Sequence, residues 1–347
     1  MNLDEQYIRH CNELASKGLG LTAPNPMVGC VIVSDGKIIS EGYHEKYGEA
    51  HAEVNAICRS DHDFSKSTLY VNLEPCSHFG KTPPCADLII SRKFQKVVIG
   101  CTDPNPLVAR KGILKLKGAG IEVISGVLQK ECEELNKRFF TFHRKKRPYI
   151  ILKWAQTSDG FISKNPLPEN KSENWISGEE SKKIVHQWRS EEQAIMVGTT
   201  TVLNDDPELT TRSVKGKNPL RIIIDKDLKL DPSFKVFNGV AETLVFTNEE
   251  RSTSNKIRFI KIDFTQNIIP QIFHQLYELN IQSVLVEGGT HLIQSIIDLN
   301  VWDEVRLFIN PDKKFGNGIK APYLNSSGRD EPVHIGKDLL FVHRNLL

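Results

Sequence analysis

The sequence lacks several features that would place it in a special class of protein. It has no apolar run of the about 18 to 20 residues that a membrane-spanning helix needs. It also has no low-complexity tract and no internal repeat, and its opening residues, Met1–Gln6, are polar and acidic, unlike a secretory signal. We therefore expect a cytoplasmic globular protein without a membrane partner.

An excess of charge of either sign is also missing. The chain carries 45 Lys and Arg side chains against 43 Asp and Glu side chains, a net charge of +2. Such a balanced charge argues against a surface for general nucleic-acid binding or for binding to an anionic membrane. We expect no nucleic-acid partner, while a local basic pocket for a phosphorylated small molecule remains compatible with this balance.

Cysteine is present but not in the pattern of a disulfide scaffold. The seven cysteines are an odd number, and without a secretory opening they indicate free thiols in a reducing cytosol. Hydrophobic residues make up 39% and charged residues 25%, which is ordinary for a soluble globular protein. A length of 347 residues predicts two domains.

The first half alternates helical and strand patterns, which is typical of a layered α/β domain. Apolar residues at helical spacing predict a helix over residues 4–17, which Gly18 and Gly20 end. Strands are predicted at residues 28–33, 38–43, 69–73, 96–100 and 120–124. Further helices are predicted over residues 51–59, from residue 85 onward, and around residues 113–117.

The basic run Phe142–Pro148 is the predicted domain boundary, with domains at 1–147 and 148–347. We interpret this run as a solvated linker, the usual role of a charge run, with phosphate contact as the alternative. Beyond it the pattern indicates a second α/β domain. Its strands are predicted at residues 149–155, 194–198, 221–225, 243–246, 283–287 and 305–309, and its helices at residues 179–190 and 290–299.

The strongest chemical signal combines His51-Ala52-Glu53 with Pro75-Cys76 and Cys85. One histidine and two cysteines offer three ligands to zinc and leave the fourth position open, as a catalytic zinc requires. Water bound there can ionise with a pKa of about 7 instead of about 15.7. Glu53 is placed to move protons without ligating the metal. His-x-Glu followed by Pro-Cys and a second Cys is the pattern of zinc nucleobase deaminases.

Each of these residues is weak evidence alone, because a single histidine is more often structural and a buried cysteine often acts as a small hydrophobe. A purely structural zinc would need a fourth protein ligand. His78 is the only nearby candidate, and Glu53 would then have no task. Eight residues (77–84) separate the two cysteines where deaminases usually have two. Loops that carry function tolerate such insertions.

Further motifs resemble the family of bifunctional riboflavin-biosynthesis deaminase–reductases, over nearly the whole chain. In the first half these motifs are Thr22–Cys30, His51–Glu53, Glu74–Cys85 and Asp103–Pro106. In the second half they are Leu152-Lys153, Ser158–Gly160, Trp175–Gly178, Thr201–Pro207, Leu209–Arg212 and Glu287–Gly289. The resemblance implies an N-terminal cytidine-deaminase-like α/β/α layered domain and a C-terminal dihydrofolate-reductase-like α/β domain.

The resemblance also implies two consecutive reactions on phosphorylated pyrimidines. The first domain, with one zinc ion per chain, would remove an amine from 2,5-diamino-6-ribosylamino-4(3H)-pyrimidinone 5′-phosphate. The second would use NADPH to reduce the ribosyl group of the resulting 5-amino-6-(5-phosphoribosylamino)uracil to ribityl. We expect a homo-oligomer, although no residue pattern sets the number of subunits.

Carried over by motif, six residues should bind the deaminase substrate. Asn25, His44, His78 and Lys81 should line the pyrimidine and ribose pocket, and Asp103 and Asn105 should reach the ribose phosphate side. An amide such as that of Asn25 can read a base edge, and the ammonium of Lys81 is a point charge for phosphate or carbonyl. The alternatives are a turn residue between prolines for Asn25 and a solvated loop tip for Lys81.

The second half has no Gly-x-Gly-x-x-Gly fingerprint, so a Rossmann cofactor site is not indicated. Instead, the strand ending at Glu287 leads through Gly288-Gly289 into a helix, whose N–H groups can face a pyrophosphate. The alternative is a helix start without a ligand. The cofactor contacts implied by the resemblance are Ala155, Trp175, Thr201, Asp205, Gly289, Thr290, His291, Leu292, Ile293, Gln294 and Ser295.

The implied contacts with the reductase substrate are Lys153, Ser172, Arg189, Leu209, Arg212 and Glu287. Two arginines suit a phosphorylated sugar, with a surface charge as the alternative for Arg189. No general acid for the reduction stands out, and cofactor and positioning carry this step.

Two other functions compete with this hypothesis. One is a deaminase of polynucleotides, as in tRNA-editing relatives, against which the long insert between the cysteines and the even charge balance argue. The other is a chain with one inactive half that serves as a binding or assembly module. The intact set of His51, Glu53, Cys76 and Cys85 argues against this for the first half, and the second half offers less evidence.

Overall fold

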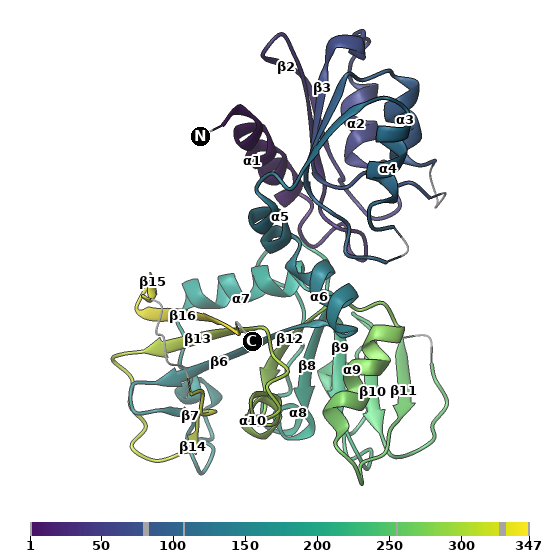
Figure 1. Ribbon diagram of the computed structural model, residues 1–347. Helices are drawn as coiled ribbons and strands as arrows, with labels where there is room; N and C mark the ends of the chain where they lie inside the picture. The colour runs from purple at the N-terminus through teal and green to yellow at the C-terminus, as the bar shows by residue number, and fades with distance from the viewer. Residues whose placement is uncertain (1, 79–82, 107, 255, 326–330, 346–347) are drawn as a thin grey trace. The chain divides into compact units, whose positions relative to one another are not determined.

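The computed structural model describes residues 2–78, 83–106, 108–254, 256–325 and 331–345. The chain forms two compact units, Met1–Lys146 and Arg147–Leu347 (Figure 1). Both are α/β, as the sequence predicts. In the described part of the chain, no helix is both long and apolar enough to cross a membrane.

The first unit is built on a five-stranded sheet in the order β2-β1-β3-β4-β5. The strands are β1 (Gly29–Ser34), β2 (Lys37–Tyr43), β3 (Thr68–Leu73), β4 (Lys96–Cys101) and β5 (Glu122–Ser125). β1 pairs antiparallel with β2 and β3, whereas β3, β4 and β5 run parallel. The segments that follow β3 and β4 therefore leave the sheet at the same edge.

Helices cover both faces of this sheet (Figure 1). One face carries α2 (Ala52–Cys58), α3 (Cys85–Ser91) and α4 (Lys111–Gly118), and the other carries α1 (Leu3–Ser16) and α5 (Gln129–Leu135). A short 3-10 helix, η1, lies at Phe64–Lys66. Because both faces are covered, all of β1 is buried, which explains its continuous apolar sequence.

The prediction of a solvated linker over residues 142–148 is wrong at both ends: Phe142 belongs to a helix, and Arg147 pairs with the buried Asp303. Helix α6 (Lys137–Lys145) includes Phe142, which is buried with Phe139 and Phe140. The phenylalanines supply the buried face that the basic residues obscured in the sequence. The helix ends at Lys146, which has a positive φ of 54°. The division between the two units follows Lys146, one residue before the predicted boundary.

The second unit is built on a nine-stranded sheet in the order β11-β10-β9-β8-β12-β6-β13-β16-β15. Its first seven strands are parallel, and β16 and β15 add antiparallel pairs at one edge. The strands are β6 (Tyr149–Thr157), β8 (Ala194–Gly198), β9 (Leu220–Ile224), β10 (Thr243–Thr247), β11 (Ile257–Lys261), β12 (Ser283–Gly288), β13 (Glu304–Asn310), β15 (Val333–Ile335) and β16 (Asp338–Arg344). A separate pair joins β7 (Phe161–Ser163) and β14 (Ile319–Lys320).

Helices again pack on both faces. α9 (Ile268–Glu278) and α10 (Thr290–Asp298) bury their apolar sides on one face, and α7 (Glu179–Glu191) packs on the other. α8 (Thr199–Asp205) directly follows β8, and two short helices, η2 (Lys171–Asn174) and η3 (Lys235–Phe237), lie in connections. α8 and α10 begin where β8 and β12 end, at the carboxyl edge of parallel strands. This edge is where open α/β sheets bind ligands.

Candidate active sites

The three predicted zinc ligands converge in the first unit. His51 precedes α2 as its N-cap, Cys76 follows β3, and Cys85 begins α3. Their ligand atoms all lie within 4.8 Å of one another. The Nδ1 atom of His51 is 3.3 Å from Cys85 Sγ and 3.6 Å from Cys76 Sγ. One imidazole nitrogen and two thiol sulfurs form a donor set that fits zinc and leaves a fourth position open.

The backbone around the cysteines favours a thiolate. The N–H of Cys85 donates to Cys76 Sγ at 3.3 Å, and the N–H of Ala86 donates to the Cys76 carbonyl at 3.1 Å. The adjoining Cys85 thiol, followed by His51, lowers the pKa of Cys76 to about 4. The same contact raises the pKa of Cys85 well above its ordinary value. Because a thiol must lose its proton to ligate, metal binding at this pair releases protons.

Glu53 lies in the first turn of α2 and is 3% exposed. Burial, and then the charge of Cys76, raises the pKa of this carboxyl group. A buried carboxyl group beside a metal site, and not counted among its ligands, suits proton transfer.

Asn25 and His44 are held together beside the metal ligands. The Nδ1–H of His44 donates to the Ala50 carbonyl at 2.9 Å, so its Nε2 accepts from Asn25 Nδ2 at 3.2 Å. The rings of His44 and His51 meet edge to face, with centroids 5.4 Å apart. Burial lowers the pKa of His44, which keeps the imidazole neutral. The Asn25 amide is therefore oriented, with its oxygen left as an acceptor.

The other predicted deaminase residues follow β3 and β4. The Asn105 N–H donates to Asp103 Oδ1 at 2.7 Å, which closes a tight turn. Burial is the main cause that raises the pKa of Asp103 to about 6, and the charge of His78 acts against it. His78 is exposed, and Lys81 lies outside the described residues. The substrate contacts of these residues stay predictions.

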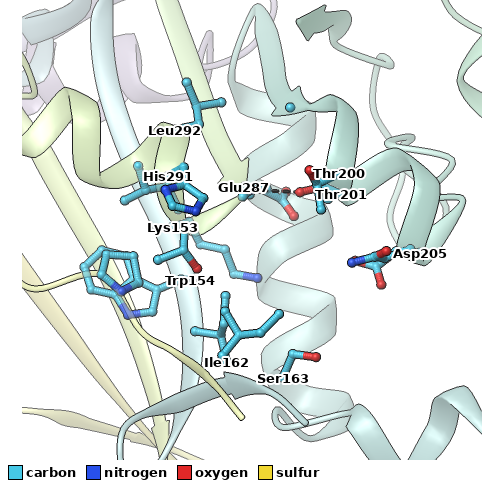
Figure 2. A pocket seen from close by; sticks show the side chains of 18 of the residues that line it. Lys153, Trp154, Ile162, Ser163, Thr200, Thr201, Asp205, Glu287, His291 and Leu292 are labelled. Atoms are coloured by element: carbon cyan, nitrogen blue, oxygen red, sulfur yellow. Dashed lines mark hydrogen bonds between the residues drawn. The ribbon is translucent and has the colours of Figure 1, made fainter. Parts of the chain in front are cut away.

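The second unit contains a cavity of about 1240 Å³ (Figure 2). Most of the predicted reductase residues line it. These are Lys153, Ala155, Trp175, Thr201, Asp205, Glu287, Gly289, Thr290, His291, Leu292, Ile293 and Ser295. The cavity wall also includes residues that were not predicted from the sequence, among them Ile162, Asn174, Lys182, Thr199, Thr200 and Asn267. Thr199 and Thr200 directly follow a predicted strand, a position that could have indicated them.

The turn between β12 and α10 is packed tightly against α8. The Gly289 N–H donates to Thr201 Oγ1 at 2.8 Å, and a Cβ at Gly288 would lie 3.1 Å from the Thr201 side chain. Gly289 has a φ of +45°, which favours glycine. The two glycines place no side chain of their own at the start of α10, which lies at the cavity wall. The volume and this cradle fit a dinucleotide such as NADPH.

Glu287, Arg189 and Lys153 form a buried charge cluster at the cavity. Arg189 donates from Nε and Nη2 to the two carboxylate oxygens of Glu287, both at 2.7 Å. Burial alone would raise the pKa of Glu287, but the charges of Arg189 and Lys153 outweigh it and hold this pKa at about 2. Burial lowers the pKa of Lys153, whose ammonium group points into the cavity (Figure 2).

Five predicted reductase residues do not line the cavity. Arg189 reaches it only through Glu287, and Leu209 is buried in the core. Ser172 is exposed and bonds to Asn170, whereas Asn174, two residues further on, lines the cavity. The side chain of Arg212 pairs with Glu208 at 2.8 Å.

The fifth residue, Gln294, uses both ends of its amide on the Tyr323 backbone, at 2.7 and 3.2 Å. This double hydrogen bond fixes the segment beside Ile319 and Pro322, which belongs to the cavity wall. Contacts of these five residues with cofactor or substrate stay predictions.

Two family models match the chain. The model "RibD C-terminal domain" matches residues 148–327, and "Cytidine and deoxycytidylate deaminase zinc-binding region" matches residues 1–101. The riboflavin biosynthesis protein RibD of Aquifex aeolicus is 42% identical over 340 residues, covering 96% of this chain and 94% of the relative. The same-named protein of Actinobacillus pleuropneumoniae is 40% identical, covering 92% and 86%.

Solved structures agree with these sequence matches. The Thermotoga maritima diaminohydroxyphosphoribosylaminopyrimidine deaminase/5-amino-6-(5-phosphoribosylamino)uracil reductase has a TM-score of 0.89 at 38% identity, covering 99% of this chain and 98% of that one. Acinetobacter baumannii RibD has a TM-score of 0.88 at 30% identity, covering 98% of both chains. Because the identity extends over nearly the full length of this chain and of its relatives, the chain belongs to the RibD family of riboflavin biosynthesis proteins.

Proposed function

We propose that this protein is a bifunctional enzyme that catalyses two consecutive steps of riboflavin biosynthesis. The first unit deaminates 2,5-diamino-6-ribosylamino-4(3H)-pyrimidinone 5′-phosphate by hydrolysis. The second unit reduces the ribosyl group of the product to ribityl with NADPH. The observation that carries the proposal is the convergence of His51, Cys76 and Cys85 beside the buried Glu53, in a chain that also holds a dinucleotide-sized cavity.

In the deamination, Nδ1 of His51 and the thiolates of Cys76 and Cys85 would hold the zinc ion. When bound, zinc supplies a water molecule that ionises near neutral pH. Glu53 would take one proton from the water and pass it to the ring nitrogen as the water oxygen bonds to the amine-bearing carbon. It would then carry the remaining hydroxyl proton to the amino group, so that the C–N bond breaks, ammonia leaves and a carbonyl group remains. Asn25, oriented by His44, offers its oxygen to an N–H group of the base.

In the reduction, NADPH supplies the hydride. The N–H groups at the start of α10 would hold its pyrophosphate. Glu287 and Lys153, which line the cavity, would orient the hydroxyl groups of the ribose, while Arg189 holds the Glu287 carboxylate in place. We assign proton donation to Lys153, because its ammonium group points into the cavity.

The test uses one purified sample and three measurements. The protein should contain about one zinc per chain, release ammonia from the diaminopyrimidine without NADPH, and bind NADPH in calorimetry. Absence of zinc would refute the metal assignment. Failure of NADPH to bind at millimolar concentration would refute the reductase assignment, independently of the first unit.

We also propose that the enzyme is a homo-oligomer in the cytoplasm. The seven cysteines are all free, which agrees with a reducing compartment. Multi-angle light scattering should give a mass of at least twice the 39.2 kDa of one chain. A monomer at micromolar concentration would contradict this part of the proposal.

A further inference from the structure

The first unit contains a buried carboxylate that the proposed mechanism does not use. Glu74 is 4% exposed and lies between β3 and the Pro75-Cys76 pair. No ion pair to Glu74 is found in the described part of the chain; its hydrogen bonds come from four backbone N–H groups. Oε1 accepts from Gly112 at 3.0 Å and Ile113 at 3.3 Å. Oε2 accepts from Arg110 at 2.9 Å and Asp103 at 3.3 Å.

These hydrogen bonds join two segments that meet at the deaminase site. The first is the segment that delivers the metal ligand Cys76, two residues after Glu74. The second segment comprises residues 103–106 and 108–113 and carries the predicted substrate contacts Asp103 and Asn105. The N–H groups of Asp103 and Arg110 both donate to Glu74 Oε2. The Glu74 N–H also donates to the Cys101 carbonyl at 2.9 Å, so its backbone holds the end of β4.

Packing at the start of α4 makes the connection rigid. A Cβ at Gly112 would lie 2.1 Å from the Pro75 carbonyl oxygen, closer than real Cβ contacts allow. The first turn of α4 therefore rests directly on the segment that carries Cys76.

We propose that Glu74 is a positioning residue for the deamination, which holds Asp103 and the segment Arg110–Ile113 at a fixed place relative to Cys76. This inference rests on the proposed deaminase function. This positioning role needs a carboxylate, because each of its two oxygens accepts hydrogen bonds from two N–H groups. An amide has only one oxygen, and its NH₂ group would face the other two N–H donors, which would then have no acceptor. An N–H group left without an acceptor is destabilising, so the amide would loosen the attachment of this segment.

The test is Glu74→Gln in the full-length, zinc-loaded protein, with Asp338→Asn as matched control. Asp338 is a 1% exposed carboxylate of the second unit that accepts from Gly178 N at 2.8 Å and Ser181 Oγ at 2.6 Å. The measurements are zinc content, KM and kcat for ammonia release, and hydrogen exchange of residues 103–113 by mass spectrometry.

For Glu74→Gln we expect full zinc content, a KM raised about tenfold, a kcat within about threefold of wild type, and faster exchange of residues 103–113. Asp338→Asn should leave the deamination KM and this exchange unchanged. An unchanged KM overturns the proposal. If zinc is lost and kcat falls while KM stays constant, Glu74 supports only the metal ligand.

If Glu74→Gln does not fold, Glu74→Asp is measured in the same way, because it keeps both acceptors and the charge but reaches less far. The same split between KM and kcat decides the outcome. A wild-type protein that releases no ammonia refutes the proposed function itself. In that case the exchange measurement still decides whether Glu74 fixes this segment.

Discussion

Glu53 follows the metal ligand His51 by two residues and is almost fully buried. Substitution Glu53→Gln keeps the shape of the side chain but removes the group that accepts the water proton. We predict that ammonia release falls by about 100- to 10,000-fold while zinc content stays unchanged. Reduction of the deaminated product by the same sample serves as the internal control. Ammonia release at the wild-type rate would contradict the assigned role.

The pair of Arg189 and Glu287 is the clearest electrostatic feature of the second unit. Removing the cation by Arg189→Met leaves a buried carboxylate without its partner, which costs about 3–5 kcal/mol. We predict a lower unfolding temperature for the second unit and reduced NADPH oxidation, with deamination unchanged. Arg212→Met, which removes an exposed pair with Glu208, should change the unfolding temperature little. Equal effects of the two substitutions would contradict this account.

The same pair sets a pH dependence of stability. The pKa of Glu287 is about 2 in the folded protein, against about 4.3 for an unperturbed glutamate. Because the folded pKa is the lower one, its stabilising effect is complete above about pH 4.3 and is lost as the pH falls toward 2. Acid unfolding of Glu287→Gln should therefore show a weaker pH dependence in this range than that of the wild type. Identical acid-unfolding curves would contradict it.

At the level of single residues, the metal ligands could be predicted because a histidine and two cysteines at this sequence spacing are typical of a zinc site. His51, Cys76 and Cys85 converge as expected. Pairings over long sequence distances could not be predicted. Nothing in the sequence indicates that Arg189 bonds to Glu287, 98 residues away, or that Gln294 turns to the Tyr323 backbone. Such partners depend on strand order and helix orientation.

Among the elements, the turn from β12 into α10 decides cofactor binding. Gly289 has a positive φ of 45°, and an alanine there is strained by about 1 kcal/mol or more. We predict that Gly289→Ala weakens NADPH binding about tenfold in calorimetry, because relief of this strain would move the first N–H groups of α10. Gly118→Ala, at a helical glycine with open space around it, should leave binding unchanged. An unchanged NADPH affinity of Gly289→Ala would contradict the proposed binding of the pyrophosphate at this turn.

Helix and strand positions were predicted well where apolar periodicity was strong. The predicted helix over residues 179–190 and strand over 194–198 match α7 and β8 closely. Helix α6 was missed because its basic residues resemble a linker, although its phenylalanines are buried in the folded unit. Lys81 lies outside the described part of the chain, and its contact with the substrate stays a prediction.

For the whole molecule, the two activities are assigned to separate units. All three metal ligands belong to the first unit, and the cavity belongs to the second. We predict that a chelator abolishes ammonia release but leaves NADPH oxidation with the deaminated substrate at its original rate. Added zinc should restore the first activity. Loss of both activities after chelation would contradict this separation.

The central claim is that one chain performs deamination first and reduction second. The most direct measurement follows ammonia and NADPH together, in one sample of zinc-loaded protein given the diaminopyrimidine phosphate. The account predicts immediate ammonia release, NADPH oxidation after a lag, and one NADPH oxidised for each ammonia released. In Glu53→Gln, both signals should be lost with the diaminopyrimidine, and NADPH oxidation should return when the deaminated compound is supplied. NADPH oxidation that begins without ammonia release would contradict the claim.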